Sequence, residues 1–176
     1  HAVARIMAQI MVPTPVRQVK VYDPSAGSGT LLMSLAHQIG EENCTIYSED
    51  ISQKSSNMLR LNLVLNNLTH SIPNIIKTNT IAQPTYLDTK FDFHADLDKD
   101  VFKKRFFAGI PNIPKSKKES MAIYLLFIQH IMFSLSDTGK AAIVLPTGFI
   151  TAQSGIDKKI RERLITNGWL RGVVSM

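Results

Sequence analysis

Residues 19–30 read VKVYDPSAGSGT, and this stretch decides the fold of the chain. Its apolar residues Val19, Val21 and Tyr22 predict a β-strand that ends at Asp23 and Pro24. Small residues fill positions 25–29 and predict a turn, after which apolar residues at helical spacing predict a helix: Leu31, Leu32, Leu35, Ala36 and Ile39. A strand, a tight glycine turn and a helix form the first half of a nucleotide-binding βαβ unit.

The glycines of this turn narrow the class of ligand. Glycine lets the backbone adopt a positive φ, and a ligand can approach it without meeting a Cβ. The dinucleotide fingerprint G-x-G-x-x-G fails because Leu32 stands where its third small residue belongs, and no Gly-Lys-Ser/Thr follows to cradle a phosphate. The turn lacks a phosphate-binding motif and follows an acidic residue, which favours a cationic or zwitterionic ligand. The alternative is a turn that serves only to reverse the chain.

A second acid is expected at the same edge of the sheet. Residues 44–47 predict a second strand, which ends in Ser48-Glu49-Asp50, about twenty residues after the glycine turn. In such a unit an acid at this strand end can accept hydrogen bonds from both hydroxyls of a ribose. Asp50 is the better candidate because Ser52 can cap the next helix, which places Asp50 at the strand tip. Alternatively, Asp50 is a solvated acid at a strand end.

Helices and strands alternate along the rest of the chain. Two helices, over residues 1–11 and 52–68, have apolar faces with the following members: Val3, Met7 and Ile10 in the first, and Met58, Leu61, Leu65 and Leu68 in the second. Further helices are predicted over 119–135 and around Ile156, Ile160 and Leu164, and strands over 73–77, 90–93, 141–145 and 170–174, with 141–145 central. This alternation predicts an α/β fold with a mostly parallel sheet that helices cover on both faces.

Composition sets limits on the function. The 176 residues allow one domain, and 44% hydrophobic with 19% charged residues is typical of a soluble globular protein. The formal net charge of +6 favours polyanionic partners. The single cysteine, Cys44, excludes a disulfide framework and a cysteine metal site and is expected to be a small core residue in a reducing compartment. No membrane span or signal peptide is visible.

Residues 94–118 are charged and aperiodic, which predicts a loop. Its basic residues Lys103, Lys104 and Arg105 either hold phosphates or are simply solvated. In the helix that follows, His130 lies between apolar positions, so we expect a packed histidine rather than a catalytic base.

Two sets of residues carry a resemblance to a known family. The turn resembles motif I of S-adenosylmethionine-dependent methyltransferases, in the D-P-x-x-G-S-G form of the adenine-specific DNA enzymes. The order of blocks along nearly the whole chain resembles the modification (methyltransferase) subunit of type I restriction–modification systems: HAVARIMAQIM, DPSAGSGTLL, IYSEDIS, FIQHIMFSLSDTGKAAIVLPTGF and IRERLITNGWLRGVV. The resemblance implies a class I, Rossmann-like methyltransferase fold, with residues 1–176 as a fragment of the catalytic domain.

The resemblance also implies a cofactor and its site. S-adenosyl-L-methionine would place its ammonium group near Asp23 and its ribose on Asp50, with Ile51 against the adenine face. Asn79 would meet the adenine edge, where the family usually has an acid. No metal is implied, and the cofactor-binding residues are Asp23, Pro24, Ala26, Gly27, Ser28, Gly29, Asp50, Ile51 and Asn79.

The family's catalytic tetrapeptide, Asn-Pro-Pro-Phe/Tyr or Asp-Pro-Pro-Tyr, is absent from the sequence. It is expected directly after Phe93, where the chain instead continues as His94-Ala-Asp-Leu-Asp-Lys-Asp. We therefore expect the protein to carry a further segment between Phe93 and His94. The sequence also begins inside an apolar helical pattern without an initiator Met, which suggests a piece of a longer protein.

The implied reaction is methyl transfer to the exocyclic amine of an adenine flipped out of double-stranded DNA. The implied partners are a DNA-specificity subunit and a restriction subunit in the cytoplasm of a bacterium or archaeon, with no membrane. Three alternatives stay open: a methyltransferase-like binding or scaffold module without chemistry, an RNA or protein methyltransferase of the same fold, and a dinucleotide oxidoreductase, which Leu32 and the Asp-Pro entry disfavour.

Overall fold

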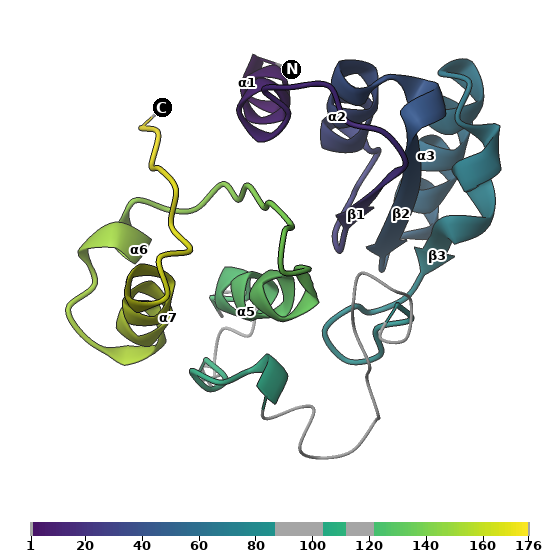
Figure 1. The fold of residues 1–176 in the computed structure, drawn as a ribbon. Helices are drawn as coiled ribbons and strands as arrows, with labels where there is room; N and C mark the ends of the chain where they lie inside the picture. Colours follow the sequence, from purple (N-terminus) through teal and green to yellow (C-terminus); the bar gives the residue numbers. More distant parts are fainter. Residues whose placement is uncertain (1, 87–103, 112–121, 176) are drawn as a thin grey trace. The chain divides into compact units, whose positions relative to one another are not determined.

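A computed structural model of the chain describes residues 2–86, 104–111 and 122–175 (Figure 1). The chain divides into two compact units, the first formed by His1–Ala95 with Ser134–Ala142 and the second by Asp96–Phe133 with Ile143–Met176. The predicted fourth strand at 90–93, the Phe93–His94 junction and Lys103 lie outside the described residues. Within the described ranges, no helix is long and apolar enough to cross a membrane.

The first unit contains a parallel sheet of three strands among the described residues, in the order β1-β2-β3. The strands are β1 (Val19–Asp23), β2 (Cys44–Asp50) and β3 (Ile75–Lys77). Helix α2 (Thr30–Ile39) connects β1 to β2, and α3 (Gln53–Leu65) connects β2 to β3 through the short helix η2 (Thr69–Asn74) (Figure 1). The predicted strand–turn–helix unit and the parallel α/β class are therefore confirmed.

The core of this unit lies between the sheet and the two connecting helices. Ile46 of β2 is fully buried against Leu32 of α2 and against Leu59 and Leu63 of α3. Each of these buried aliphatic side chains contributes about 2 kcal/mol of apolar burial. Cys44 is 3% exposed in the same cluster, which confirms it as a small core residue. The helix pair thus fixes the turn between β1 and α2 at the carboxyl edge of the sheet.

The first helix, α1 (Ala2–Met11), forms where predicted, but its apolar face is not the packed one. Val3 and Ile10 are 39% and 57% exposed, whereas Ala8 is 2% exposed and packs with Leu35 of α2. Ala8, together with the partly buried Met11, therefore packs α1 against α2.

Helix α3 shows the same difference. Met58, Leu61 and Leu65 of the predicted face are exposed, while Leu59 and Leu63 are buried; Leu68, beyond the helix end, is buried as expected. Helix-compatible spacing is present on both sides of α3, so spacing alone does not identify the covered side. The predicted start is confirmed, whereas the helix ends at Leu65, three residues before the predicted limit at residue 68. The Ser52 hydroxyl accepts a hydrogen bond from the Ser55 N–H, and the chain leaves the helix at Asn66 and Asn67.

The second unit contains α5 (Tyr124–Ser134), α6 (Gly148–Thr151) and α7 (Gly155–Thr166). Ile128, Phe149 and Ile160 form its buried core. Gln129 is fully buried there: its side-chain oxygen accepts from the Ala108 N–H at 2.8 Å, and its nitrogen donates to the Gly109 carbonyl at 3.0 Å. A satisfied buried amide therefore fastens the 108–109 turn to α5.

Arg105 corrects the interpretation of the basic cluster, because it is neither solvated nor free to hold a phosphate. It is 4% exposed, its Nε donates to Nδ1 of His130 at 3.0 Å, and its guanidinium lies 4.6 Å from the Phe106 ring centroid. Burial and the neighbouring Arg105 charge lower the pKa of His130 to about 3. His130 is thus a packed, neutral histidine, as predicted.

The strands predicted at 141–145 and 170–174 are wrong. Neither segment is a strand, and Val144 and Val173 are 58% and 62% exposed. An apolar run becomes a strand only when a neighbouring strand pairs with its backbone N–H and C=O groups. The described strands β1, β2 and β3 pair with one another, and neither segment joins their sheet.

Candidate cofactor-binding site

The predicted glycine turn stands at the carboxyl end of β1. Gly27 and Gly29 both have positive φ, 56° and 83°, which is the left-handed region that glycine adopts without strain. The Gly29 N–H donates to the Ala26 carbonyl at 2.8 Å, and the Gly29 carbonyl accepts from Met33, which opens α2. Ligands of parallel α/β sheets bind outside this edge, so the turn is in the position that a nucleotide-type cofactor requires.

The two glycines have different surroundings. A Cβ on Gly27 would meet nothing within 4 Å, whereas a Cβ on Gly29 would lie 2.2 Å from Cδ1 of Leu59. The open approach expected for both glycines therefore applies to Gly27. At Gly29 the missing Cβ lets the turn pack on α3.

Asp50 ends β2 and reaches the glycine turn. Its Oδ2 accepts from the Gly27 N–H at 2.9 Å, and its Oδ1 accepts from the Ser52 N–H at 2.7 Å. Each carboxylate oxygen retains the capacity for a further hydrogen bond. Asp50 is thus a structural link between β2 and the turn as well as an acceptor at the sheet edge.

Asp23 ends β1 beside the same turn, and its Oδ1 accepts from the Ser25 N–H at 2.9 Å. Burial raises the pKa of Asp23 above its ordinary value; the bond from Ser25 opposes this rise, and the negative charge of Asp50 adds to it. The structure therefore brings together the two predicted acids, and a cation placed beside Asp23 would favour its ionised form.

The backbone carbonyls of Pro24 and Ser28 are held by side chains that sequence reasoning did not single out for this role. The hydroxyl of Thr80, itself 4% exposed, donates to the Pro24 carbonyl at 2.7 Å. The side-chain nitrogen of Asn62 donates to the Ser28 carbonyl at 2.9 Å. Only the position of Thr80 in Thr78-Asn79-Thr80, at a predicted strand tip, could have drawn attention to it.

The two residues expected near the adenine have contrasting surroundings. Ile51 is 68% exposed directly after Asp50, so its side chain offers an apolar surface at the sheet edge. Oδ1 of Asn79 accepts from the N–H groups of Ile81 and Ala82 at 3.1 and 3.2 Å. Asn79 therefore caps its own turn, and its side-chain NH₂ group can donate hydrogen bonds to a ligand.

Glu49, next to Asp50, points to the opposite side of the sheet. It is fully buried, accepts from the Tyr22 hydroxyl at 2.8 Å and also accepts from the Thr85 N–H. The Tyr86 ring packs edge-on against Tyr22, with 5.8 Å between centroids. This cluster anchors residues 80–86, which follow Asn79, to the sheet. It explains why Asp50 rather than Glu49 faces the glycine turn.

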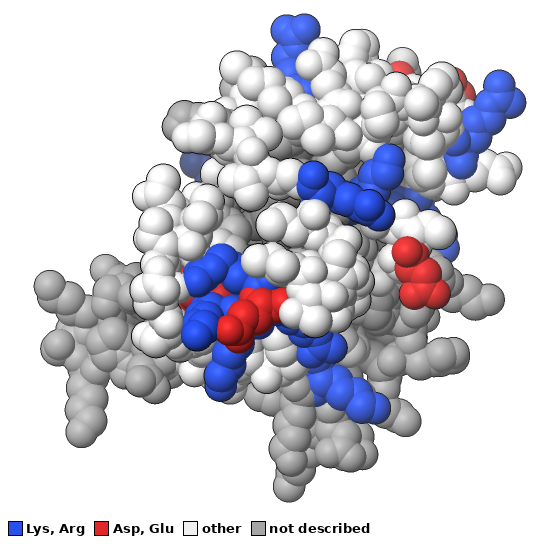
Figure 2. Space-filling model, turned by 60° about the vertical axis from the view of Figure 1, so that its left-hand side comes forward, with Lys and Arg blue, Asp and Glu red and all other residues white. Residues whose placement is uncertain are grey.

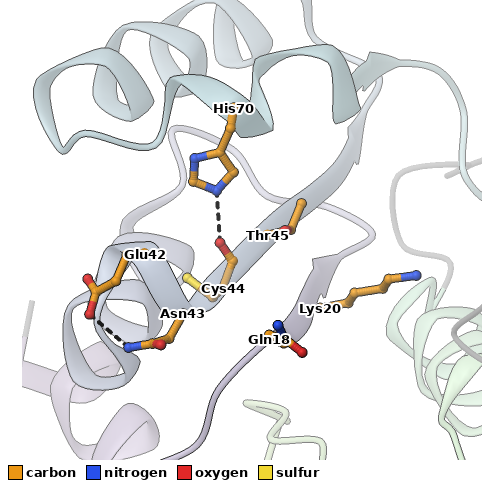
Figure 3. Close-up of a pocket in the computed structure, with 7 residues that line it drawn as sticks. All are labelled: Gln18, Lys20, Glu42, Asn43, Cys44, Thr45 and His70. Atoms are coloured by element: carbon orange, nitrogen blue, oxygen red, sulfur yellow. Dashed lines mark hydrogen bonds between the residues drawn. The ribbon is translucent and has the colours of Figure 1, made fainter.

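A separate pocket of about 310 Å³ lies at the other end of the strands (Figure 3). Gln18, Lys20, Cys44 and Thr45 line it from the amino ends of β1 and β2, and Nε2 of His70 donates to the Cys44 carbonyl at 2.9 Å. Burial and nearby glutamates raise the pKa of the Cys44 thiol to about 11, which makes it a poor nucleophile. This pocket is remote along the strands from the predicted site residues.

The fold and the geometry of the carboxyl edge define a Rossmann-like α/β domain with a glycine turn and two carboxylates at the edge where sheets of this kind bind nucleotide-type cofactors. The chain belongs to the N-6 DNA Methylase family, whose model matches residues 1–176.

Curated relatives and a solved structure agree with this assignment. The chain is 25% identical over 200 aligned positions to the type I restriction enzyme MpnII methylase subunit of Mycoplasma pneumoniae, covering 99% of this chain and 35% of that protein. It is 24% identical over 173 positions to the HindI methylase subunit of Haemophilus influenzae, covering 89% of this chain and 37% of that protein.

One structural neighbour is the type I restriction-modification system methyltransferase subunit from Streptococcus thermophilus. The TM-score is 0.69 at 19% identity, over 94% of this chain and 38% of that one, which confirms the Rossmann-like methyltransferase fold. The chain thus spans slightly more than a third of the length of each of these proteins.

Proposed function

We propose that this chain binds S-adenosyl-L-methionine at the carboxyl edge of its sheet and serves, within a longer protein, as a DNA methyltransferase specific for the N6 amine of adenine. One observation carries the proposal: two carboxylates, Asp23 and Asp50, flank a turn whose Gly27 faces open space, in a chain of the N-6 DNA Methylase family. A sulfonium cofactor with an ammonium group matches this anionic edge.

Five of the predicted residues then have a defined part in holding the cofactor. The carboxylate of Asp23 pairs with the ammonium group, and Gly27 leaves room beside the turn. Each carboxylate oxygen of Asp50 already accepts one hydrogen bond, from the N–H of Gly27 or of Ser52. Its remaining lone pairs accept hydrogen bonds from the ribose hydroxyls. Exposed Ile51 covers one adenine face, and the amide N–H groups of Asn79 reach the adenine edge.

S-adenosyl-L-methionine supplies an activated methyl group, so the protein contributes mainly position. The target adenine must leave the DNA stack before its amine can be aligned with that methyl. The family's Asn-Pro-Pro-aromatic tetrapeptide would accept from the amine and stack on the base. The alignment with the MpnII methylase subunit extends over 200 positions although this chain has 176 residues, which supports a further segment within the protein.

Duplex DNA is the proposed substrate, and the positive charge of the chain supports it. Lys158 and Lys159 are exposed on α7, and Figure 2 shows basic side chains at several places on the visible surface. Both curated relatives are named as subunits of type I restriction enzymes. We therefore propose that a DNA-specificity subunit and a restriction subunit act with this protein.

Two measurements test the proposal. Calorimetric titration with S-adenosyl-L-methionine and, separately, NAD tests the cofactor; binding of NAD alone would overturn it. Transfer of a radiolabelled methyl group to unmethylated duplex DNA, by the longer protein with its DNA-specificity subunit, tests the reaction. Label in N6-methyladenine is expected. Label in RNA or protein instead would support the alternative substrates, and cofactor binding without any transfer would indicate a binding module.

A further inference from the structure

Two peptide units of the glycine turn are each held from both sides. In a planar peptide unit, the carbonyl and the following N–H point in opposite directions, so fixing one of them orients the other. The unit between Pro24 and Ser25 accepts from the Thr80 hydroxyl at 2.7 Å and donates to Oδ1 of Asp23 at 2.9 Å. A continuous hydrogen-bonded chain therefore runs from Thr80 through the backbone to the Asp23 carboxylate.

The second unit, between Ser28 and Gly29, has the same arrangement. Its carbonyl accepts from Asn62 of α3 at 2.9 Å, and its N–H donates to the Ala26 carbonyl at 2.8 Å. This connection closes the turn on itself and does not end at a carboxylate. The connection through Thr80 is thus the one that reaches a proposed ligand group.

Thr80 is suited to act at a distance. It is 56 residues from Pro24 in the sequence, is 4% exposed, and directly follows Asn79 in the segment just beyond the end of β3 at Lys77. Its buried hydroxyl is shielded from competing water, which strengthens the bond to the Pro24 carbonyl. It also couples the β3 tip, where we place the adenine, to the turn where we place the ammonium group.

We propose that Thr80 is a positioning residue that orients the Asp23 carboxylate, through the Pro24–Ser25 peptide, toward the ammonium group of S-adenosyl-L-methionine. This inference rests on the proposed function. It predicts that loss of the Thr80 hydroxyl affects ligands that carry the ammonium group more than ligands that lack it.

The test compares two ligands in the full chain by calorimetry: S-adenosyl-L-methionine and 5′-methylthioadenosine, which keeps the ribose and adenine but lacks the ammonium group. Thr80→Val removes the hydroxyl and keeps the shape, and we expect about tenfold weaker binding of the first ligand with little change for the second. Thr80→Ser should restore the wild-type ratio of the affinities for the two ligands. Thr78→Val is the matched control, because the Thr78 hydroxyl bonds the Gln83 carbonyl within its own loop.

A double-mutant cycle with Asp23→Asn identifies the route. If Thr80 acts through Asp23, Thr80→Val causes no further fall in the affinity ratio once Asp23 is replaced. Equal weakening of both ligands by Thr80→Val, or additive effects of the two changes, would show a merely structural threonine and overturn the inference. If the wild-type chain binds neither ligand, the proposed function fails first and the inference fails with it.

Discussion

Gly27 donates its backbone N–H to the carboxylate of Asp50 over 2.9 Å, which fastens the turn after β1 to the tip of β2. A residue that the sequence suggests only as a ribose acceptor therefore also shapes the loop where we propose that the rest of the cofactor binds. Since the Ser52 N–H uses the other oxygen at 2.7 Å, changes at Asp50 will affect the turn, the start of α3 and the ligand together.

Replacing Asp50 tests the ribose assignment. Asp50→Asn keeps one acceptor oxygen but places an NH₂ group against a backbone N–H and removes the charge, so S-adenosyl-L-methionine should bind at least about tenfold more weakly. Asp137→Asn, an exposed acid outside the site, should leave affinity unchanged. Calorimetric titration measures both. Wild-type affinity in Asp50→Asn would remove the ribose role.

The two glycines should respond differently to alanine. At Gly27 the added methyl enters open space, so we expect a modest loss of stability from the left-handed backbone, about 1–2 kcal/mol, and a clear loss of cofactor binding. At Gly29 the methyl meets Leu59, so the melting temperature should fall further. Thermal unfolding with and without ligand separates the two effects. Equal melting temperatures would contradict the packing role of Gly29.

The ionised Asp23 should lower the stability of the fold and strengthen cofactor binding. The pKa of Asp23 is raised in the folded state, so the folded chain binds the proton more tightly than the unfolded chain. The stability that this group contributes therefore falls as the pH rises from the ordinary aspartate pKa through the raised one. Asp23→Asn should therefore raise the melting temperature at pH 7, and the gain should vanish below about pH 4. Cofactor affinity should fall in the variant. In the wild type, affinity should decline as pH approaches the raised pKa from above.

Scanning fluorimetry at several pH values and titration with the cofactor measure these two trends. A variant that is less stable at neutral pH, or that binds the cofactor normally, would show that Asp23 is a structural acid.

Gln129 should stabilise the second unit. Gln129→Ala leaves the buried Ala108 N–H and Gly109 carbonyl without this partner, and we expect a loss of about 2 kcal/mol or more in the free energy of unfolding. Gln153→Ala is the control, because Gln153 is exposed and its side-chain nitrogen donates a hydrogen bond to the nearby Thr151 carbonyl. Urea unfolding monitored by circular dichroism distinguishes the two. Similar stability losses would contradict the fastening role of Gln129.

His130 should contribute to acid sensitivity. Its pKa is about 3 in the folded state, so the unfolded chain takes up the proton first as pH falls below the ordinary histidine value of about 6.5. Stability from this group is therefore full above that value and declines toward pH 3. Replacement by glutamine should flatten the dependence of unfolding free energy on pH between these limits, which urea titrations at pH 4 and pH 7 can measure.

The sequence was sufficient for the strand–turn–helix unit because local chemistry decides it. Gly27 and Gly29 set the turn, Ser52 caps α3, and Asp23 and Asp50 end adjacent parallel strands, so their proximity follows from topology. Short-range signals of this kind do not depend on what the rest of the chain does.

Other features depend on long-range contacts and could not be predicted from the sequence. Val3 and Met58 belong to regular apolar stripes, yet Ala8 and Leu59 are the residues that pack. Val144 lies in an apolar run that predicts a strand, but no pairing with the described sheet forms. Thr80 and Asn62 support the turn from positions 56 and 34 residues away, and their residue types alone carry no sign of it.

The dual attachment of Asp50 gives the site a built-in reporter. The amides of Gly27 and Ser52 both donate hydrogen bonds to this one carboxylate. A ribose that donates to the remaining lone pairs of Asp50 should therefore also change the hydrogen bond at the first turn of α3. Deuterium uptake at these two amides should change together when the cofactor arrives, which makes them a matched pair of local probes for occupancy.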